Sequence, residues 1–133
     1  MPPARLLIVE DEFIIAMAAE EILLDAGYEV VGTAASFEAA VQMTGTARPD
    51  LVIMDINLGR GKDGVEAALE IFDQYAIRSL FTSGNQDETN IRRAEPAQPV
   101  GWLPKPYSDG ALIEAVRAFD AAREQAAASL GAN

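Results

Sequence analysis

Five short apolar runs, separated by stretches with helical periodicity, are the feature that most constrains the fold of this sequence. The apolar runs span residues 5–9, 28–34, 49–55, 77–83 and 100–105. The intervening and final segments place apolar residues three or four positions apart, which is the spacing of one helix face; they span 12–27, 37–47, 63–75, 86–95 and 108–128. A strand–helix unit repeated five times predicts an α/β protein whose parallel sheet is covered by helices on both faces.

Local signals support the helix boundaries. Gly27 stands where a helix commonly ends, and Ser36 and Ser108 stand where a side chain can cap a helix N-terminus. The apolar stripe predicted for the first helix consists of Ile14, Met17, Ala18 and Ile22, and that of the third helix consists of Val65, Leu69 and Phe72.

The length of 133 residues fits one ordinary domain. We find no linker, so we expect a single domain over residues 1–133 with a folded core over about 4–128. Half of the residues are apolar, yet no apolar run approaches the roughly 20 residues needed to cross a bilayer. The beginning of the chain lacks the pattern of a secretory signal. We therefore expect no membrane association.

The composition excludes several kinds of chemistry. The chain contains no histidine and no cysteine, so it cannot build a serine–histidine–aspartate triad, a histidine-ligated zinc site or a disulfide. The absence of cysteine fits a cytoplasmic protein. The formal net charge of −11 argues against direct binding to nucleic acid, because phosphate contacts need clusters of lysine and arginine.

Chemically distinctive residues follow four of the five predicted strands. The first strand is followed by Glu10 and Asp11, and the others end in Asp55, Ser83 and Lys105. Each has an ordinary explanation when taken alone: an acid can complement the dipole of a helix, a serine can belong to a turn, and a lysine can be solvated at the surface. Their shared position at strand ends is what indicates a site.

We expect three of these carboxylates to meet at one edge of the sheet. The common order of a five-stranded doubly wound sheet is 2-1-3-4-5, which makes the first and third strands neighbours at the ligand-binding switch point. Glu10, Asp11 and Asp55 would then share one crevice and repel one another. A divalent cation would relieve this repulsion, and an all-oxygen ligand set favours Mg²⁺ over Zn²⁺.

Taken together, the motifs resemble a receiver domain, the phosphoacceptor module of two-component response regulators. The resemblance covers nearly the whole chain and is carried by "LLIVEDE", "LVIMDINL", "DGVEAA", "FTSGN" and "LPKPYS". It implies the flavodoxin-like (βα)5 fold that the pattern also predicts. It further implies a signalling protein that assists its own phosphorylation, and not an enzyme acting on an external substrate.

The resemblance also implies a role for each site residue. Asp55 matches the phosphorylated aspartate, and Lys105 matches the lysine of a Lys-Pro motif whose peptide bond is usually cis in this family. The Mg²⁺ ligands would be Asp11, Asp55 and the backbone carbonyl of Asn57, with Glu10 acting through water. Mg²⁺ would neutralise charge on the transferring oxygens.

Two further residues match positions that report phosphorylation. Ser83, followed by the small residue Gly84, would hydrogen-bond a phosphoryl oxygen. Trp102 occupies the aromatic switch position, where tyrosine or phenylalanine is usual, and its bulk is expected to restrict an inward rotation of the ring. We expect phosphorylation to act chiefly on residues 83–95, because the loop after Ser83 leads into a short polar helix.

The resemblance implies partners as well. The phosphoryl donor would be a histidine kinase or a histidine phosphotransfer protein, and the domain would be a monomer or a phosphorylation-dependent dimer. Two other functions stay open: a phosphatase-like enzyme with an aspartate nucleophile and Mg²⁺, and a binding module that is never phosphorylated. The first normally has a D-x-D motif on its first strand, which is absent here, and the intact set of site residues argues against the second.

Overall fold

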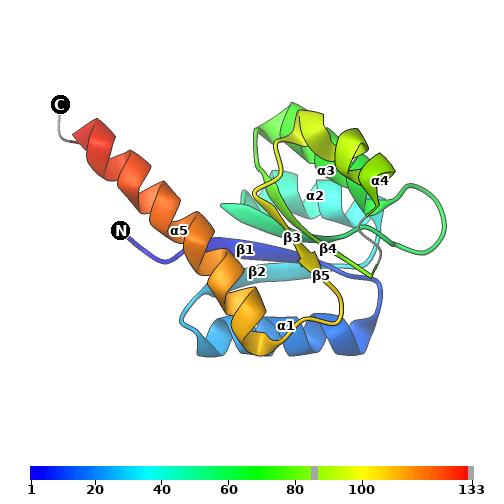
Figure 1. Ribbon diagram of the computed structural model, residues 1–133, viewed down its shortest axis with the longest axis horizontal. Helices are drawn as coiled ribbons and strands as arrows, with labels where there is room; N and C mark the ends of the chain where they lie inside the picture. Colours follow the sequence, from blue (N-terminus) through cyan, green and yellow to red (C-terminus); the bar gives the residue numbers. More distant parts are fainter. Residues whose placement is uncertain (85–86, 132–133) are drawn as a thin grey trace.

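The computed structural model describes residues 1–84 and 87–131. Strands and helices alternate along the chain, as the apolar pattern predicts (Figure 1). The strands are β1 (Arg5–Val9), β2 (Glu29–Ala34), β3 (Leu51–Asp55), β4 (Ser79–Ser83) and β5 (Gly101–Pro104). The helices are α1 (Phe13–Asp25), α2 (Phe37–Ala47), α3 (Gly64–Tyr75), α4 (Glu88–Ala94), the short 3-10 helix η1 (Glu95–Ala97) and α5 (Asp109–Gly131).

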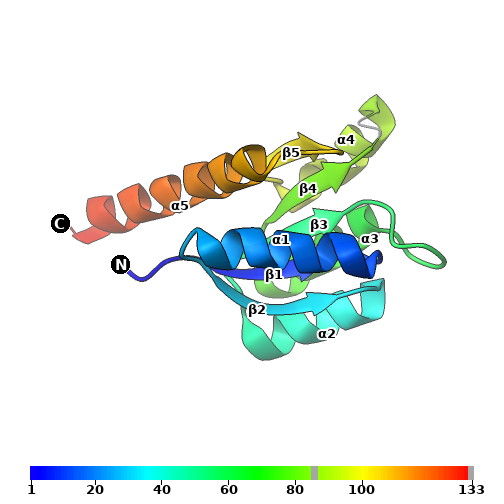
Figure 2. The same cartoon turned by 90° about the horizontal axis from the view of Figure 1, so that it is seen from below.

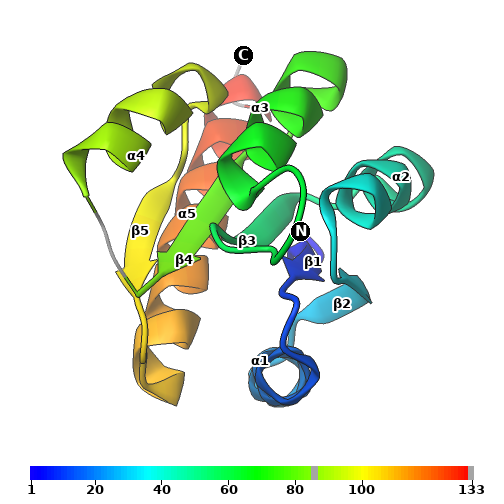
Figure 3. The same ribbon diagram turned by 90° about the vertical axis from the view of Figure 1, so that its right-hand side faces the viewer.

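The five strands form one parallel sheet in the order β2-β1-β3-β4-β5, which confirms the predicted fold class and strand order. The central strands β3 and β4 are buried along their whole length, because helices cover both faces of the sheet. Helices α1 and α5 lie on one face, and α2, α3 and α4 lie on the other (Figures 2 and 3). All strands run in one direction, so their carboxyl ends share one edge of the sheet.

Two hydrophobic clusters fill the space on either side of the sheet. Phe81, Met54 and Ile71 belong to the cluster beneath α2, α3 and α4. Leu6, Leu23 and other residues form the cluster beneath α1 and α5. Successive residues of one strand therefore point into different clusters. Asp55 ends the β3 run "LVIM" and is itself buried, so the site begins where the core ends.

Several predicted helix ends are confirmed by their capping contacts. Ser36 accepts a hydrogen bond from the backbone N–H of Ala39 at 3.2 Å, and Ser108 accepts one from Ala111 at 3.1 Å. Gly27 has a φ of +96°, the left-handed conformation that lets the chain leave α1. These local contacts set where α2 and α5 begin and where α1 ends.

The predicted inner face of α1 is wrong. Ile14 and Met17, two members of the predicted stripe, are largely exposed to solvent. The residues that α1 buries are Ala16, Ala19 and Leu23. Small side chains face the sheet because they allow the helix backbone to approach it closely, and larger apolar side chains are left on the outside. Because α1 carries apolar residues on more than one side, helical periodicity alone does not show which side faces the sheet.

The remaining differences lie at element ends. α5 continues three residues beyond the predicted end at 128, and the predicted helix over 86–95 is divided into α4 and η1, with Pro96 inside η1. Residue 86, the predicted start of that helix, lies outside the described residues. Within the described ranges, no helix is both long enough and apolar enough to span a membrane.

Candidate functional site

Three carboxylates lie together at the carboxyl edge of the sheet, which faces the viewer in Figure 3. Glu10 follows β1, Asp11 is the next residue, and Asp55 ends β3. One oxygen from each carboxylate lies within 4.8 Å of the others. Glu10 and Asp55 are buried, whereas Asp11 is exposed and leaves the cluster open to solvent on one side. The parallel pairing of β1 with β3 produces this convergence.

Lys105 brings a positive charge to the same cluster. Its Nζ lies 2.5 Å from Oε1 of Glu10 and 3.3 Å from Oδ2 of Asp55. The backbone holds the lysine there, because its N–H donates to the carbonyl oxygen of Ser83 at 2.8 Å. The peptide bond between Lys105 and Pro106 is cis, as the resemblance implies. The ion pair with Glu10 is shorter, so Asp55 is the less compensated carboxylate.

The loop after Asp55 packs tightly against the aspartate's own backbone. The N–H of Asn57 donates to Oδ1 of Asp55 at 3.2 Å, and the N–H of Gly64 donates to the carbonyl of Ile56 at 2.7 Å. A Cβ placed on Gly64 would lie only 1.9 Å from the carbonyl oxygen of Asp55. The first residue of α3 must therefore be glycine for the loop to close at this point.

The carboxylates differ in how strongly they hold a proton. Burial and the charge of Glu10 raise the pKa of Asp55 from 3.8 to about 7, against the opposing charge of Lys105. Burial and Glu10 also raise the pKa of Asp11. Burial is the largest single influence on Glu10 and acts to raise its pKa, but the hydrogen bonds that its carboxylate accepts from Lys105 and from the N–H of Glu12, together with its contact to Asp55 and the charge of Lys105, bring the pKa below its ordinary value. Asp55 is therefore the carboxylate whose ionised form a bound cation would stabilise most.

The donor set suits a hard divalent cation. All of its side-chain ligands are carboxylates, two carboxylates are buried with a single lysine between them, and their oxygens are close enough to share one ion. Mg²⁺ prefers such oxygen ligands and retains several waters, which the exposed side at Asp11 can admit.

Ser83 ends β4, the strand next to Asp55, and Trp102 lies one strand further away, on β5. Ser83 is buried at the end of β4, next to Thr82, which pairs with Asp55 across the sheet. Trp102 pairs with Phe81, and the two rings stack with centroids 4.6 Å apart. Half-buried Trp102 thus rests on a fully buried ring.

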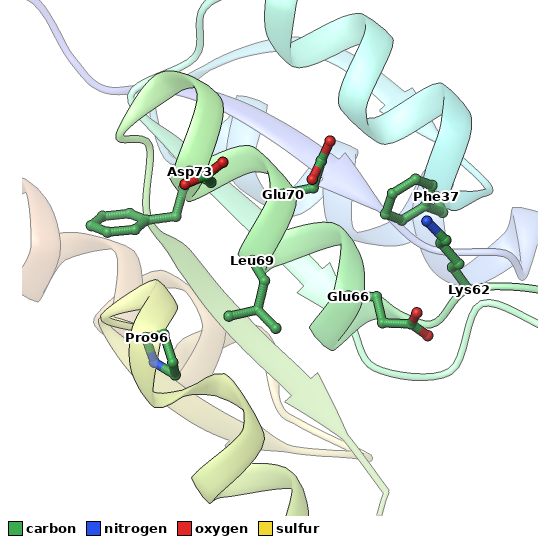
Figure 4. Close-up of a pocket in the computed structure, with 8 residues that line it drawn as sticks. Phe37, Lys62, Glu66, Leu69, Glu70, Asp73 and Pro96 are labelled. Atoms are coloured by element: carbon green, nitrogen blue, oxygen red, sulfur yellow. The ribbon is translucent and has the colours of Figure 1, made fainter.

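An open groove between α2, α3 and η1 is separate from this site. Figure 4 shows Glu66, Glu70 and Asp73 along α3, with Lys62 over the ring of Phe37 at 4.7 Å. The groove contains none of the predicted site residues. Its acidic side chains are spaced along the outer surface of one helix, where water solvates them.

Two residues around the site were missed by the sequence analysis. Asp63 caps α3 in a reciprocal arrangement with Glu66, and Arg93 on α4 binds the same carboxylate. The Asp-x-x-Glu spacing before an apolar helix is a recognised capping signal, so Asp63 could have been predicted. The pairing with Arg93 joins residues thirty positions apart, and no local sequence pattern predicts it.

The sheet and its edge define a doubly wound α/β protein with a carboxylate-and-lysine site at the switch point between β1 and β3. The chain belongs to the family of response regulator receiver domains: the model of that family, described as "Response regulator receiver domain", matches residues 6–117. The resemblance inferred from the motifs is thereby confirmed, and the chain is a module of two-component signal transduction.

Named relatives agree with this assignment. The transcriptional regulatory protein PdtaR of Mycobacterium tuberculosis is 38% identical over 114 residues, which cover 86% of this chain but only 55% of PdtaR. The chain thus spans about half of that relative. The chemotaxis protein CheY of Thermotoga maritima is 31% identical over 114 residues, covering 84% of this chain and 93% of CheY.

A solved structure gives the same result for the fold. The signal receiver domain of a modulated diguanylate cyclase from Desulfovibrio desulfuricans superimposes with a TM-score of 0.79 at 31% identity. The superposition covers 86% of this chain and 91% of that domain.

Proposed function

We propose that this domain accepts a phosphoryl group on the carboxylate of Asp55. The observation that carries the proposal is the position of this carboxylate: it is buried at a strand end, 3.3 Å from Lys105 and clustered with Glu10 and Asp11. A carboxylate that is costly to bury and incompletely compensated is suited to act as a nucleophile when a cation is bound.

The transfer would form one bond and break one. An oxygen of Asp55 attacks phosphorus, an acyl phosphate forms, and the bond from phosphorus to the donor's nitrogen breaks, leaving the electron pair on that nitrogen. Mg²⁺, held by Asp11, Asp55 and the carbonyl of Asn57 with Glu10 acting through water, would supply the charge that stabilises the transferring oxygens. Lys105 is placed to pair with a phosphoryl oxygen as a point charge.

Ser83 and Trp102 would report the modification. Ser83 ends the strand beside Asp55 and is proposed to hydrogen-bond a phosphoryl oxygen. The new group adds about −1.5 to −2 charge at pH 7, which can reorganise only those elements that contact it. Because Trp102 is stacked on Phe81, the response is expected to be larger in the segment that follows Ser83 than at the indole ring.

The test is the intact mass of the protein after incubation with acetyl phosphate and Mg²⁺. A stable gain of one phosphoryl group is the expected result. Continuous release of phosphate with rapid turnover would instead identify a phosphatase-like enzyme. A protein that binds Mg²⁺ yet never gains mass would be a module that is not phosphorylated.

Removing one carboxylate should weaken the metal site. We expect Asp11→Asn to lower Mg²⁺ affinity at least about tenfold in calorimetry, because an amide oxygen carries no charge. Affinity in the unsubstituted protein should rise between about pH 6 and pH 8, because the metal competes with the proton on Asp55. Asp25→Asn, at the far end of α1, is the control. Equal affinities in both variants would remove Asp11 from the site.

The phosphoryl donor is proposed to be a histidine kinase or a histidine phosphotransfer protein. The surface next to the site fits a protein donor, because α1 begins directly after the acid pair and exposes Phe13 and Ile14. An apolar groove runs from Ile14 towards Pro106 and Tyr107, just beyond Lys105. A small phosphodonor has no need of such a surface.

This surface gives a prediction that separates the two kinds of donor. Replacing Phe13 and Ile14 together with alanine should slow transfer from the phosphorylated histidine protein about tenfold or more, because buried apolar anchors dominate protein interfaces. Modification by acetyl phosphate should be unchanged. Leu130→Ala is the control, since Leu130 is as exposed as Ile14, at 78%, but lies at the far end of α5. Equal slowing with both donors would contradict this interface.

A further inference from the structure

A two-pronged ion pair joins α4 to the beginning of α3. Nη1 of Arg93 lies 3.0 Å from Oδ2 of Asp63, and Nη2 lies 3.3 Å from Oδ1. The guanidinium also donates from Nη1 to Oδ1 of Asn90, one turn earlier in α4, at 2.8 Å. One side chain therefore binds a turn of α4 and a residue of another element at the same time. The planar guanidinium fits a carboxylate in this way, whereas a lysine cannot.

Asp63 is fixed at the start of α3, and the next residue packs against the backbone of Asp55. Oδ1 of Asp63 accepts the N–H of Glu66 at 2.9 Å, and its own N–H donates to the side chain of Glu66 at 3.1 Å. The next residue, Gly64, packs against the carbonyl of Asp55 and donates to that of Ile56. The carboxylate that binds Arg93 thus stands at the end of a closed loop that starts at Asp55.

Among the described residues, α4 has few other polar contacts with neighbouring elements. It contains seven residues, of which Ala94 is buried. Two further side-chain contacts of α4 lie within the helix and its cap: Asp87 accepts a hydrogen bond from the N–H of Asn90, and Arg92 pairs with Glu88. A short helix with little buried apolar surface lies at the low end of local stability. A single contact to a neighbouring element can therefore decide where it rests.

We propose that the Arg93–Asp63 pair is a latch that holds α4 in its resting position and couples it to the phosphoacceptor loop. When Asp55 carries a phosphoryl group, the loop from Ile56 to Asp63 must accommodate the new oxygens and the metal. Displacement of Asp63 would break its ion pair with Arg93, and α4 would be free to leave its resting position. The proposal rests on the proposed function of Asp55, but the latch itself is a property of the unmodified protein.

Hydrogen exchange over residues 88–94 tests the latch. Arg93→Gln removes the guanidinium, and Asp63→Asn removes the charge while keeping a good helix cap. Each should speed amide exchange in α4 about two- to fivefold in the unmodified protein, since a partly exposed pair contributes modestly. The double variant should exchange no faster than either single variant. Arg92→Gln is the control, because it removes the same charge from the same helix but breaks only a contact within α4.

The same measurement with beryllium fluoride and Mg²⁺, a mimic of the phosphoryl group, tests the coupling. In the unsubstituted protein the mimic should speed exchange in α4, and in Arg93→Gln it should add little to an already fast exchange. Equal exchange in Arg93→Gln and Arg92→Gln without the mimic, or an undiminished response of Arg93→Gln to it, would overturn the latch. Failure of the proposed function would appear differently, as an unsubstituted protein that neither gains mass from acetyl phosphate nor responds to the mimic.

Discussion

Asp55→Asn will gain no mass from acetyl phosphate and Mg²⁺, whereas the unsubstituted protein will gain one phosphoryl group. The amide of asparagine lacks the anionic oxygen that attacks phosphorus, and the other buried carboxylate, Glu10, is engaged by Lys105 at 2.5 Å. Asp73→Asn, on the exposed surface of α3, is the control and should be modified as fully as the unsubstituted protein. Full modification of Asp55→Asn would assign the phosphoryl group to another residue.

The same substitution will also stabilise the metal-free fold at neutral and alkaline pH. The pKa of Asp55 is raised from 3.8 to about 7, so the folded protein holds this proton more tightly than the unfolded chain does. The stabilisation by the bound proton is complete below the unfolded pKa of 3.8 and is lost as the pH rises through about 7. Asparagine does not ionise and escapes this loss, while Lys105 keeps Glu10 as its partner.

Urea unfolding in the presence of a chelator measures this difference. Relative to the unsubstituted protein, Asp55→Asn should gain about 1–3 kcal/mol in the free energy of unfolding near pH 8 and almost nothing near pH 4. If the difference in the free energy of unfolding did not change with pH, ionisation of Asp55 would not destabilise the fold. The expected result would make Asp55 a residue kept for its chemistry at the expense of stability.

Much of the fold could be predicted because the relevant signals are local. Apolar runs of strand length set the five strands, and hydroxyl caps such as Ser36 and Ser108 set helix starts within a few residues. The strand order follows from the way parallel sheets are commonly wound, and this order alone predicts that Glu10, Asp11 and Asp55 meet at one edge of the sheet. The candidate site is thus a consequence of position along the chain and topology.

The features that escaped prediction depend on packing between elements. α1 is apolar on more than one side, and only the closeness of the sheet selects Ala16 and Ala19 over Ile14 for burial. The bond between Arg93 and Asp63 depends on where α4 settles against α3. The need for glycine at position 64 depends on a carbonyl nine residues earlier. None of these three features can be recognised from the periodicity or the composition of the sequence.

Gly64→Ala will be the most destabilising of the single substitutions considered. The added methyl group would lie 1.9 Å from the carbonyl oxygen of Asp55 and 2.9 Å from Cα of Ile56, both of which are backbone atoms that no rotamer change can move away. Either α3 must shift as a whole or the loop must open, and both lose the 2.7 Å hydrogen bond from Gly64 to Ile56. Overpacking of this kind costs about 3 kcal/mol or more.

Thermal unfolding with matched substitutions distinguishes this contact from a general effect of replacing glycine. Gly110→Ala, in α5, meets no atom within 4 Å and should change the free energy of unfolding by between zero and a gain of about 1 kcal/mol, because alanine favours a helix. Gly64→Ala should lower the melting temperature by about 10 °C. It should also slow modification by acetyl phosphate, because the displaced atoms belong to Asp55 itself. A Gly64→Ala protein as stable as Gly110→Ala would mean that the loop after β3 can relax without cost. Asp55, the proposed phosphoacceptor, would then not be held in place by the start of α3.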